Sequence, residues 1–419
     1  MSIPSLSSLC CNKKSKKMSV TARALNARLT LYPSGRVVKN RFMKAATSEG
    51  TATYDQDDAL VTGVPTPAII NAYEKWAAGK WGLIVTGGIA IDTFGINYLP
   101  GNMWIGEKED CPKRRKAFSD LAKAVHKHDG TLIGQVLNIE DGMAYLAADH
   151  ASAAQLSRTI YAAKYLAESG FDGIELGTPE PPKDKAGKPD VRKVLELVDF
   201  QRTVIRTALP SQTSEKFIFG LKVSTARMQQ AGVDFDGIVK ILQQAESSGY
   251  DYVAIAGGNY ENPLSTAEDR ESLYRRVIDE GRQHLGLNIA VYGNGGFRSV
   301  AVIDDLIYAR KLNGVAMAKA ACAEFDLPLK VAQNSVKSAV KNPFEFDNDS
   351  AVLAGAAQIN QAGAKTLKES KGVINDGVMD LNNSATMKQF LEAKEDYLSR
   401  KQKLKDDGRF MAGVVTLSA

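Results

Sequence analysis

The sequence predicts an α/β fold, a (β/α)8 TIM barrel with an N-terminal hairpin and a C-terminal helical extension. Apolar runs of β type recur about eight times along the chain, with amphipathic helical segments between them. The runs are continuously apolar, as expected for parallel strands that are covered on both faces. Several helical segments end at a glycine just before the next strand, which is a common helix stop. About eight such units are the number that closes a (β/α)8 barrel.

The strand and helix candidates alternate in the order that a barrel requires. The helical candidates place apolar residues at positions i, i+3 and i+4 in stretches such as AIINAYEKWAAGK and FDGIVKILQQAESSG. The strand candidates are residues 41–47 (RFMKAAT), 82–88 (GLIVTGG), 131–137 (TLIGQVL), 171–177 (FDGIELG), 217–223 (FIFGLKV), 252–258 (YVAIAGG), 288–294 (NIAVYGN) and 313–319 (NGVAMAK).

A doubly wound sheet that binds a dinucleotide is the competing fold. Its G-x-G-x-x-G fingerprint should open the first βα unit, but the first strand candidate ends in KAATSEG. Further along the chain, GNGGFR places Arg298 where the last glycine of the fingerprint belongs. The barrel is therefore the better prediction.

The composition is that of an ordinary globular protein. Of 419 residues, 44% are hydrophobic and 24% are charged, and the formal net charge is +5. This mild charge, without a basic stripe that carries interleaved aromatics, predicts no nucleic-acid partner. No apolar run reaches the roughly 18 residues of a membrane-spanning helix, so no membrane partner is expected. The four cysteines lack metal-ligand spacing, which predicts reduced thiols and no metal site.

The two ends of the chain have distinct compositions. The first 20 residues are rich in serine and lysine, and the first acidic residue is Glu49. Such a segment suits a disordered basic tail or a mitochondrial transit peptide. We expect the tail, and with it a cytoplasmic protein. Near the other end, ATMKQFLEAKEDYLSRKQKLKDD predicts a charged amphipathic helix that packs on the outside of the barrel.

The seventh strand candidate runs into a cluster of glycines, Gly293, Gly295 and Gly296. Bare backbone at a strand–loop–helix junction suits either a tight turn or a phosphate that rests on amide N–H groups. Barrels frequently bind phosphate in the loops after strands seven and eight. The eighth candidate ends at Lys319, whose ammonium would meet the same phosphate. Together the two signals favour a phosphate site.

Motifs spread over residues 27–365 resemble the old yellow enzyme family of FMN-dependent NADH:flavin oxidoreductases. In order, they are LTLYPSGRVVKNRFMKAATSEG, AYEKWAAGKWGLIVTGGIAI, YLPGNMWI, LAKAVHKHDGTLIGQV, AAKYLAESGFDGIEL, IAVYGNGGFRSVAVIDDLI and NGVAMAKAACAEFDLPLKV. Each motif alone is weak, and their order and spacing carry the resemblance. We therefore expect a basic tail at residues 1–24, an FMN-binding barrel at 25–365 and a helical extension at 366–419, in a monomer or a homodimer.

The resemblance implies roles for individual residues. Ala45, Ala46 and Thr47 would lie along the flavin ring, with Thr47 near its N5 edge. Gly88 would allow close approach of the backbone after the second strand. Gln135 would hydrogen-bond the pyrimidine edge, which the paired donor and acceptor of an amide suit.

Lysines stand at two positions where the family usually has arginine. Lys222 would lie near N1 and O2 of the flavin, where a cation stabilises the anionic reduced form. Lysine keeps the charge of arginine but loses its forked geometry. Lys319 would hold the phosphate together with Gly295, Gly296 and Ala318.

The chain departs from the family after the fourth strand. There the family places a His-x-x-His or His-x-x-Asn pair that holds the carbonyl oxygen of the substrate, followed by a tyrosine that can donate a proton. In this sequence Gly177 and Glu180 take the positions of the pair, and Pro182 takes that of the tyrosine. Ordinary activation of an α,β-unsaturated carbonyl is therefore expected to be impaired, because a carboxylate repels a developing enolate. Tyr98 and Tyr260 follow other strands and are alternative proton donors, so no catalytic residue is assigned.

Three functions remain open from the sequence. The first is an FMN-dependent oxidoreductase that takes hydride from NADH or NADPH and passes it to a small electrophile such as an enone or a quinone. The second is a barrel that binds a flavin or another phosphorylated ligand and lacks ordinary ene-reductase activity. The third is an aldolase or isomerase in which Lys222 forms a Schiff base. The order of the motifs favours the first.

Overall fold

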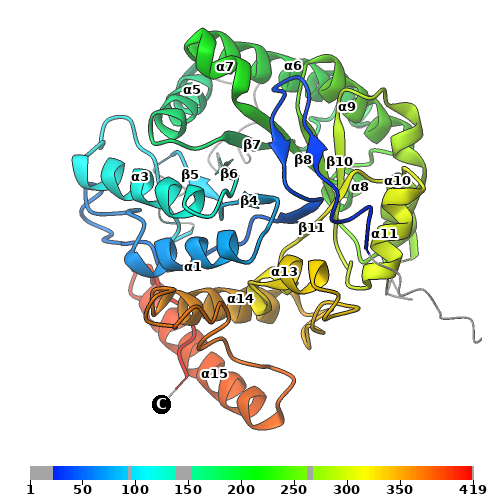
Figure 1. The fold of residues 1–419 in the computed structure, drawn as a ribbon. Helices are drawn as coiled ribbons and strands as arrows, with labels where there is room; N and C mark the ends of the chain where they lie inside the picture. Colours follow the sequence, from blue (N-terminus) through cyan, green and yellow to red (C-terminus); the bar gives the residue numbers. More distant parts are fainter. Residues whose placement is uncertain (1–21, 93–96, 98, 138–152, 262–267, 418–419) are drawn as a thin grey trace, which may run out of the picture.

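Eight parallel strands form a closed barrel in the computed structural model, which describes residues 22–92, 97, 99–137, 153–261 and 268–417 (Figure 1). Neighbouring strands pair in chain order, and the pairings of β11 with β3 and of β4 with β6 complete the ring. A short strand, β5 (Ile89–Ala90), adds to the edge of β6. The barrel strands are β3 (Phe42–Lys44), β4 (Leu83–Val85), β6 (Leu132–Leu137), β7 (Gly173–Gly177), β8 (Ile218–Ser224), β9 (Tyr252–Ala256), β10 (Ala290–Asn294) and β11 (Gly314–Met317). The predicted fold class is confirmed.

Helices surround the barrel, and their first turns follow simple capping rules. Side chains of Thr66, Asp234 and Ser299 accept hydrogen bonds from free N–H groups at the starts of α1, α9 and α11. The longer helices of this layer are α1 (Pro67–Ala78), α3 (Pro112–His126), α5 (Ala153–Glu168), α6 (Val191–Ala208), α9 (Phe235–Ser247), α10 (Glu268–Glu280), α11 (Val300–Tyr308) and α14 (Asn348–Gly363). Shorter helices are α7 (Ser211–Lys216), α8 (Thr225–Gln230), the 3-10 turn η1 (Gly281–His284), α12 (Lys319–Ala323) and α13 (Leu327–Ala332).

The predicted N-terminal hairpin lies at the amino-terminal end of the barrel. It consists of β1 (Leu29–Thr30) and β2 (Val37–Val38), which pair antiparallel. Leu31 and Val38 are buried in the same apolar cluster as the side chains inside the barrel. The amide of Ser34 donates to the carboxylate of Asp251, the residue before β9, over 2.9 Å. This end is therefore covered, and a ligand has access from the carboxyl ends of the strands, where barrel enzymes have their active sites.

The C-terminal extension packs through α15 (Ser384–Asp406) on α14, and both helices lie below α1 in Figure 1. Phe390 and Tyr397 are the buried residues of α15, and they share an apolar cluster with Ala354 and Ala357 of α14. The final segment then runs back to the barrel, where the amide of Gly413 donates to the carbonyl of Gly50 over 2.9 Å.

Phe390→Ala is expected to destabilise the whole protein by about 3–5 kcal/mol, the usual cost of truncating a buried phenylalanine. Phe390 is fully buried, and its ring lies 5.6 Å from that of Phe344. The free energy of unfolding should be measured by denaturant titration, with Leu391→Ala as the control because Leu391 is 38% exposed. A loss no larger than that of the control would show that α15 contributes little to the folded barrel.

The predicted basic tail lies almost entirely outside the described residues, which begin at Ala22. Ala22 and Leu25 are buried, and the amide of Leu25 donates to Asp304 over 2.8 Å. Within the described ranges, no helix has the length and apolar character needed to cross a membrane.

Candidate active site

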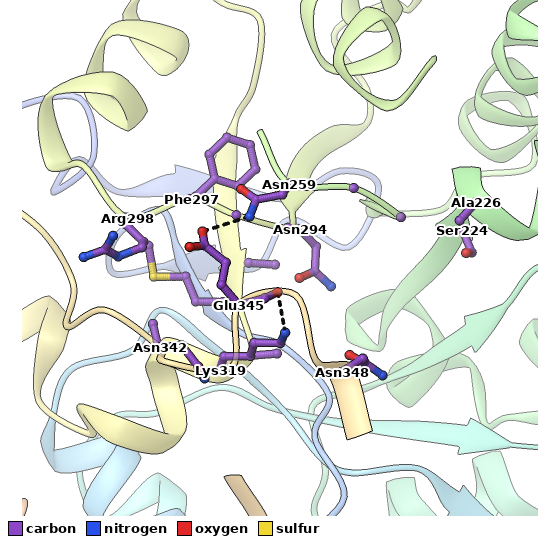
Figure 2. Close-up of a pocket in the computed structure, with 18 of the residues that line it drawn as sticks. Ser224, Ala226, Asn259, Asn294, Phe297, Arg298, Lys319, Asn342, Glu345 and Asn348 are labelled. Carbon is purple, nitrogen blue, oxygen red and sulfur yellow. Dashed lines mark hydrogen bonds between the residues drawn. The ribbon is translucent and has the colours of Figure 1, made fainter. Parts of the chain in front are cut away.

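A cavity of about 730 Å³ opens where β8, β9, β10 and β11 end (Figure 2). Its walls come from Lys222 and Ser224, from residues 257–259 and 294–298, and from residues 316–320 together with the loop after α13. Gly295, Gly296, Ala318 and Lys319, the residues that the sequence assigns to a phosphate, all line this cavity. The seventh and eighth strands therefore bring these four residues together, as predicted.

The two glycines are required by their backbone conformation and by their neighbours. Gly295 has φ of 144° and Gly296 has φ of 68°, a region that side chains disfavour. A Cβ on Gly295 would lie 2.1 Å from the carbonyl oxygen of Gly258, and one on Gly296 would lie 1.8 Å from Oδ1 of Asn259. The turn is thus both a tight turn and a stretch of bare backbone at the cavity wall.

Lys319 is the first residue of α12, and its ammonium is half-buried at the cavity. It donates to the carbonyl oxygens of Phe344 and Glu345 over 3.3 and 3.2 Å. Burial lowers the pKa of Lys319, and the nearby carboxylates of Glu345 and Asp347 oppose this shift. The cation predicted from the sequence is therefore present, but it is already engaged by the loop after α13.

Asn259 and Glu345 also belong to this end of the cavity, and sequence analysis did not identify them. The amide Nδ2 of Asn259 donates to Oε1 of Glu345 over 2.9 Å. In Figure 2 the side chain of Glu345 points from its loop toward Asn259. Neither residue lies in a motif, so only the folded arrangement places them beside Gly296.

Lys222 lies on β8 at the other side of the same cavity. Every second residue of a strand faces the same side of the sheet. Ile218 belongs to the apolar cluster inside the barrel, so the inward-facing positions of β8 are 218, 220, 222 and 224. Among the described residues, none forms a hydrogen bond or an ion pair with the ammonium of Lys222. This cation is therefore available to an anionic ligand.

Gln135 is buried inside the barrel and does not line this cavity. Its Nε2 donates to Oε1 of Glu175 over 2.7 Å, and the hydroxyl of Tyr252 donates to Oε2 of the same carboxylate over 3.0 Å. Glu175 was not singled out from the sequence. Two donors satisfy this buried carboxylate, and they fix the Gln135 amide so that its carbonyl oxygen is turned away from Glu175.

The residues after β3 turn in different directions. Ala45 is buried in the inner cluster, and the hydroxyl of Thr47 donates to the carbonyl of Ala45 over 3.1 Å. The thiol of Cys322, which is part of α12, also lies within hydrogen-bonding reach of Thr47. Ala46, by contrast, is partly exposed. The Thr47 hydroxyl therefore already donates its proton to the backbone.

Ser48 connects the end of β3 to the segment after β4. Its hydroxyl donates to Oδ1 of Asn102, and Nδ2 of Asn102 donates to the carbonyl of Gly88 over 2.9 Å. A Cβ on Gly88 would lie 2.0 Å from Cδ1 of Leu137, so any larger residue there would require the Leu137 side chain to shift. Ser48 and Asn102 are further polar groups at the mouth that the sequence analysis missed.

Two charges are buried behind the mouth, between β3 and α1. Lys44 donates to the carbonyl of Val85 over 2.9 Å, and its Nζ lies 4.4 Å from the ring centroid of Trp76. Burial lowers the pKa of Lys44 to about 8. Glu49 accepts hydrogen bonds from the hydroxyl of Tyr73 and the amide of Gly87. These contacts fix the loop after β4 next to the residues that follow β3.

The end of β7 differs from the rest of the site because it is open. Gly177 is exposed, and a Cβ built on it would meet nothing within 4 Å. Glu180 is only partly buried. Neither position carries an imidazole or an amide. Gly177 and Glu180 therefore cannot donate a hydrogen bond to a carbonyl oxygen in the way that a His-x-x-His or His-x-x-Asn pair does.

Of the two tyrosines that the sequence offers as proton donors, only Tyr260 belongs to the described residues. Tyr98 lies outside the described residues. Tyr260 stacks on Phe297 at a centroid distance of 5.1 Å, and its hydroxyl donates to Asp279 over 2.9 Å. Burial and the Asp279 carboxylate raise the pKa of Tyr260 to about 12. Tyr260 does not line the cavity, so its placement gives no support to a role in proton transfer.

No cluster of potential metal ligands is found among the described residues. The cavity is lined by cations, side-chain amides and bare backbone. These groups suit a ligand with an anionic end and a planar polar edge.

Comparison with known proteins identifies relatives over most of the chain. No family model matches it. It is 23% identical over 442 residues to the NADH-dependent flavin oxidoreductase nadA of Aspergillus parasiticus, an alignment that covers 91% of this chain and 93% of the relative. It is 22% identical to the NADH-dependent flavin oxidoreductase iliE of Hypocrea jecorina, over 72% of this chain and 87% of that protein.

Solved structures share the fold at low sequence identity. The old yellow enzyme of Trypanosoma cruzi matches with a TM-score of 0.58 and 16% identity, covering 78% of this chain and 96% of that one. Morphinone reductase matches with a TM-score of 0.55 and 14% identity, covering 77% and 92%. The resemblance predicted from the motifs is thus confirmed: this chain is similar in sequence to NADH-dependent flavin oxidoreductases and in fold to the old yellow enzymes.

Proposed function

We propose that the protein is an FMN-dependent oxidoreductase that takes hydride from NADH or NADPH and passes it to a small electrophile. The observation that carries the proposal is the pair of cations, Lys222 and Lys319, that line one cavity together with the bare backbone of Gly295 and Gly296. The names of the relatives support a flavin as cofactor and NADH as reductant.

Each end of the cavity suits a different part of the cofactor. The backbone at Gly295 and Gly296 and the ammonium of Lys319 would hold the phosphate. FMN supplies the hydride chemistry when bound. Lys222 would stabilise negative charge at the ring. Gln135 does not line the cavity, so its contact with the pyrimidine edge stays a prediction from the family resemblance.

The substrate is proposed as a small electrophile such as an enone or a quinone. Gly177 and Glu180 offer no donor for a carbonyl oxygen of either substrate. A quinone is the better candidate of the two, because it is the stronger hydride acceptor and depends less on such a donor. The same observation favours a second candidate function, a flavin-binding barrel without ordinary ene-reductase activity.

Anaerobic spectroscopy tests the proposal and separates the two candidates. The protein is expected to bind FMN and to show a yellow absorbance band that NADH or NADPH bleaches. Reoxidation of this band by a quinone or an enone would support the oxidoreductase. A protein that binds FMN without being bleached would be the binding barrel, and failure to take up FMN would contradict both.

Lys319→Ala is expected to weaken FMN binding about 10- to 100-fold, because a hydrogen bond to a charged group contributes about 1.5–3 kcal/mol. Riboflavin, which lacks the phosphate, should bind almost equally to both proteins. Quenching of flavin fluorescence measures both affinities. Lys401→Ala, which removes an exposed lysine on α15, is the matched control. Equal weakening of FMN and riboflavin would place the phosphate elsewhere.

A further inference from the structure

We infer that Glu345 is a specificity-determining residue that disfavours the phosphate of the cofactor and so sets the preference between FMN and riboflavin. The inference rests on the proposed function, since it concerns the anionic end of the same cavity. The proposed function names residues that promote binding of the phosphate, whereas Glu345 would oppose it.

The segment around Glu345 already occupies the groups that would bind the phosphate. The ammonium of Lys319 donates to the backbone carbonyls of Phe344 and Glu345. The amide of Asn259, whose Oδ1 lies against Gly296, donates to the Glu345 carboxylate over 2.9 Å. In Figure 2 this carboxylate lies between the loop that carries it and the turn at residues 294–297. An incoming phosphate would therefore meet a negative charge next to the cation that should bind it.

The loop that carries Glu345 is held at both of its sides. The ring of Phe344 packs on Phe390 of α15, and the amide of Phe344 donates to Oδ1 of Asn342 over 2.8 Å. On the other side, the carboxylate of Asp347 accepts from the amide of Ser350 over 3.0 Å and caps α14. These contacts fix the backbone on either side of Glu345, so its side chain is presented to the cavity by the fold.

Charge and hydrogen bonding then act differently on the two flavins. A phosphate that carries negative charge is repelled by a neighbouring carboxylate, and the repulsion is strong where water is partly excluded. The terminal hydroxyl of riboflavin carries no charge and can donate a hydrogen bond to the same carboxylate. Glu345 should therefore cost FMN affinity while leaving riboflavin affinity nearly unchanged.

The test is a pair of fluorescence titrations, with FMN and with riboflavin, on the full-length chain. Glu345→Gln keeps an acceptor for Asn259 and removes the charge. It is expected to tighten FMN binding by about tenfold and to change riboflavin binding by less than about twofold. The gain for FMN should shrink at high ionic strength, as a purely structural effect would not.

Asp349→Asn is the control, because it removes an exposed carboxylate from the first turn of α14 without touching the cavity. Glu345→Ala should give the same direction as Glu345→Gln if the charge is responsible. An unchanged ratio of FMN to riboflavin affinity in both Glu345 variants would overturn the inference and leave the proposed function intact. If neither flavin binds to any of these proteins, the proposed function fails together with the inference.

Discussion

Replacing Lys222 by methionine is expected to slow the reduction of bound FMN by NADH about 10²- to 10³-fold, the usual effect of removing one preorganised group that stabilises developing charge. Lys222 projects into the cavity from β8, and its ammonium has no hydrogen bond or ion pair with any of the described residues. None of the described residues therefore neutralises its charge. The rate is measured by anaerobic stopped-flow absorbance of the flavin band.

Two controls make this result specific. Lys222→Arg keeps the charge and should retain most of the rate. The methionine variant should still bind FMN through the phosphate end, because Lys319 and the turn at Gly295 are unchanged. It should also show a lower flavin reduction potential. Reduction at the normal rate in Lys222→Met would remove Lys222 from the proposed mechanism.

The second large effect is a gain of activity. The double variant Gly177→His, Glu180→Asn is expected to raise enone reduction about 10²-fold, at the lower end of what a positioned acid–base group contributes. A side chain fits at residue 177, since a Cβ there meets nothing within 4 Å. The second substitution removes a carboxylate that would oppose negative charge on the substrate oxygen. Steady-state turnover of an enone with NADH measures the gain.

The half-reaction with NADH provides the comparison for this variant. Reduction of the flavin should remain within about threefold of the unmodified protein, because both substitutions keep the Lys222 ammonium and leave the phosphate end unchanged. Residue 177 pairs with Lys222 across β7 and β8, so this half-reaction also reports any disturbance of Lys222 by the new histidine. The single substitutions should each give less than the pair, since both groups act on one oxygen. A double variant with normal flavin reduction and no gain with enones would show that the end of β7 does not face the substrate.

The barrel could be predicted from the sequence because its signals are local. Continuous apolar runs, glycines at helix ends and the turn at Gly295 and Gly296 each depend on neighbours along the chain. Lys319 could be added because it follows the eighth strand, whose neighbour carries that turn. The position of these residues on one cavity then follows from strand order alone.

The remainder of the site depends on contacts between distant segments. Glu345 lies in a loop without periodicity, and it reaches Asn259 across 86 positions of the chain. Glu175 could not be singled out because its role depends on the hydrogen bond from Gln135, which lies on the neighbouring strand. Such pairings are set by tertiary packing, which a single sequence does not reveal.

The directions of side chains beyond the end of a strand also could not be predicted from the sequence. The regular alternation of a strand ends with β3 at Lys44, so the directions of Thr47 and Ser48 cannot be extrapolated from it. In the structure the hydroxyl of Thr47 bonds to the backbone, while that of Ser48 reaches Asn102. Contact of Thr47 with a flavin stays a prediction, and Ser48 is now an additional candidate at the same edge.

The hydrogen bond between Gly413 and Gly50 has a consequence for synthesis of the protein. Residue 50 leaves the ribosome early, but its partner at position 413 is added 363 residues later. Phe390, which supports the segment around Glu345, is also translated late. The nascent chain can therefore form this contact only after residue 413 has left the ribosome, and removal of Gly413 would free a segment that follows the first barrel strand.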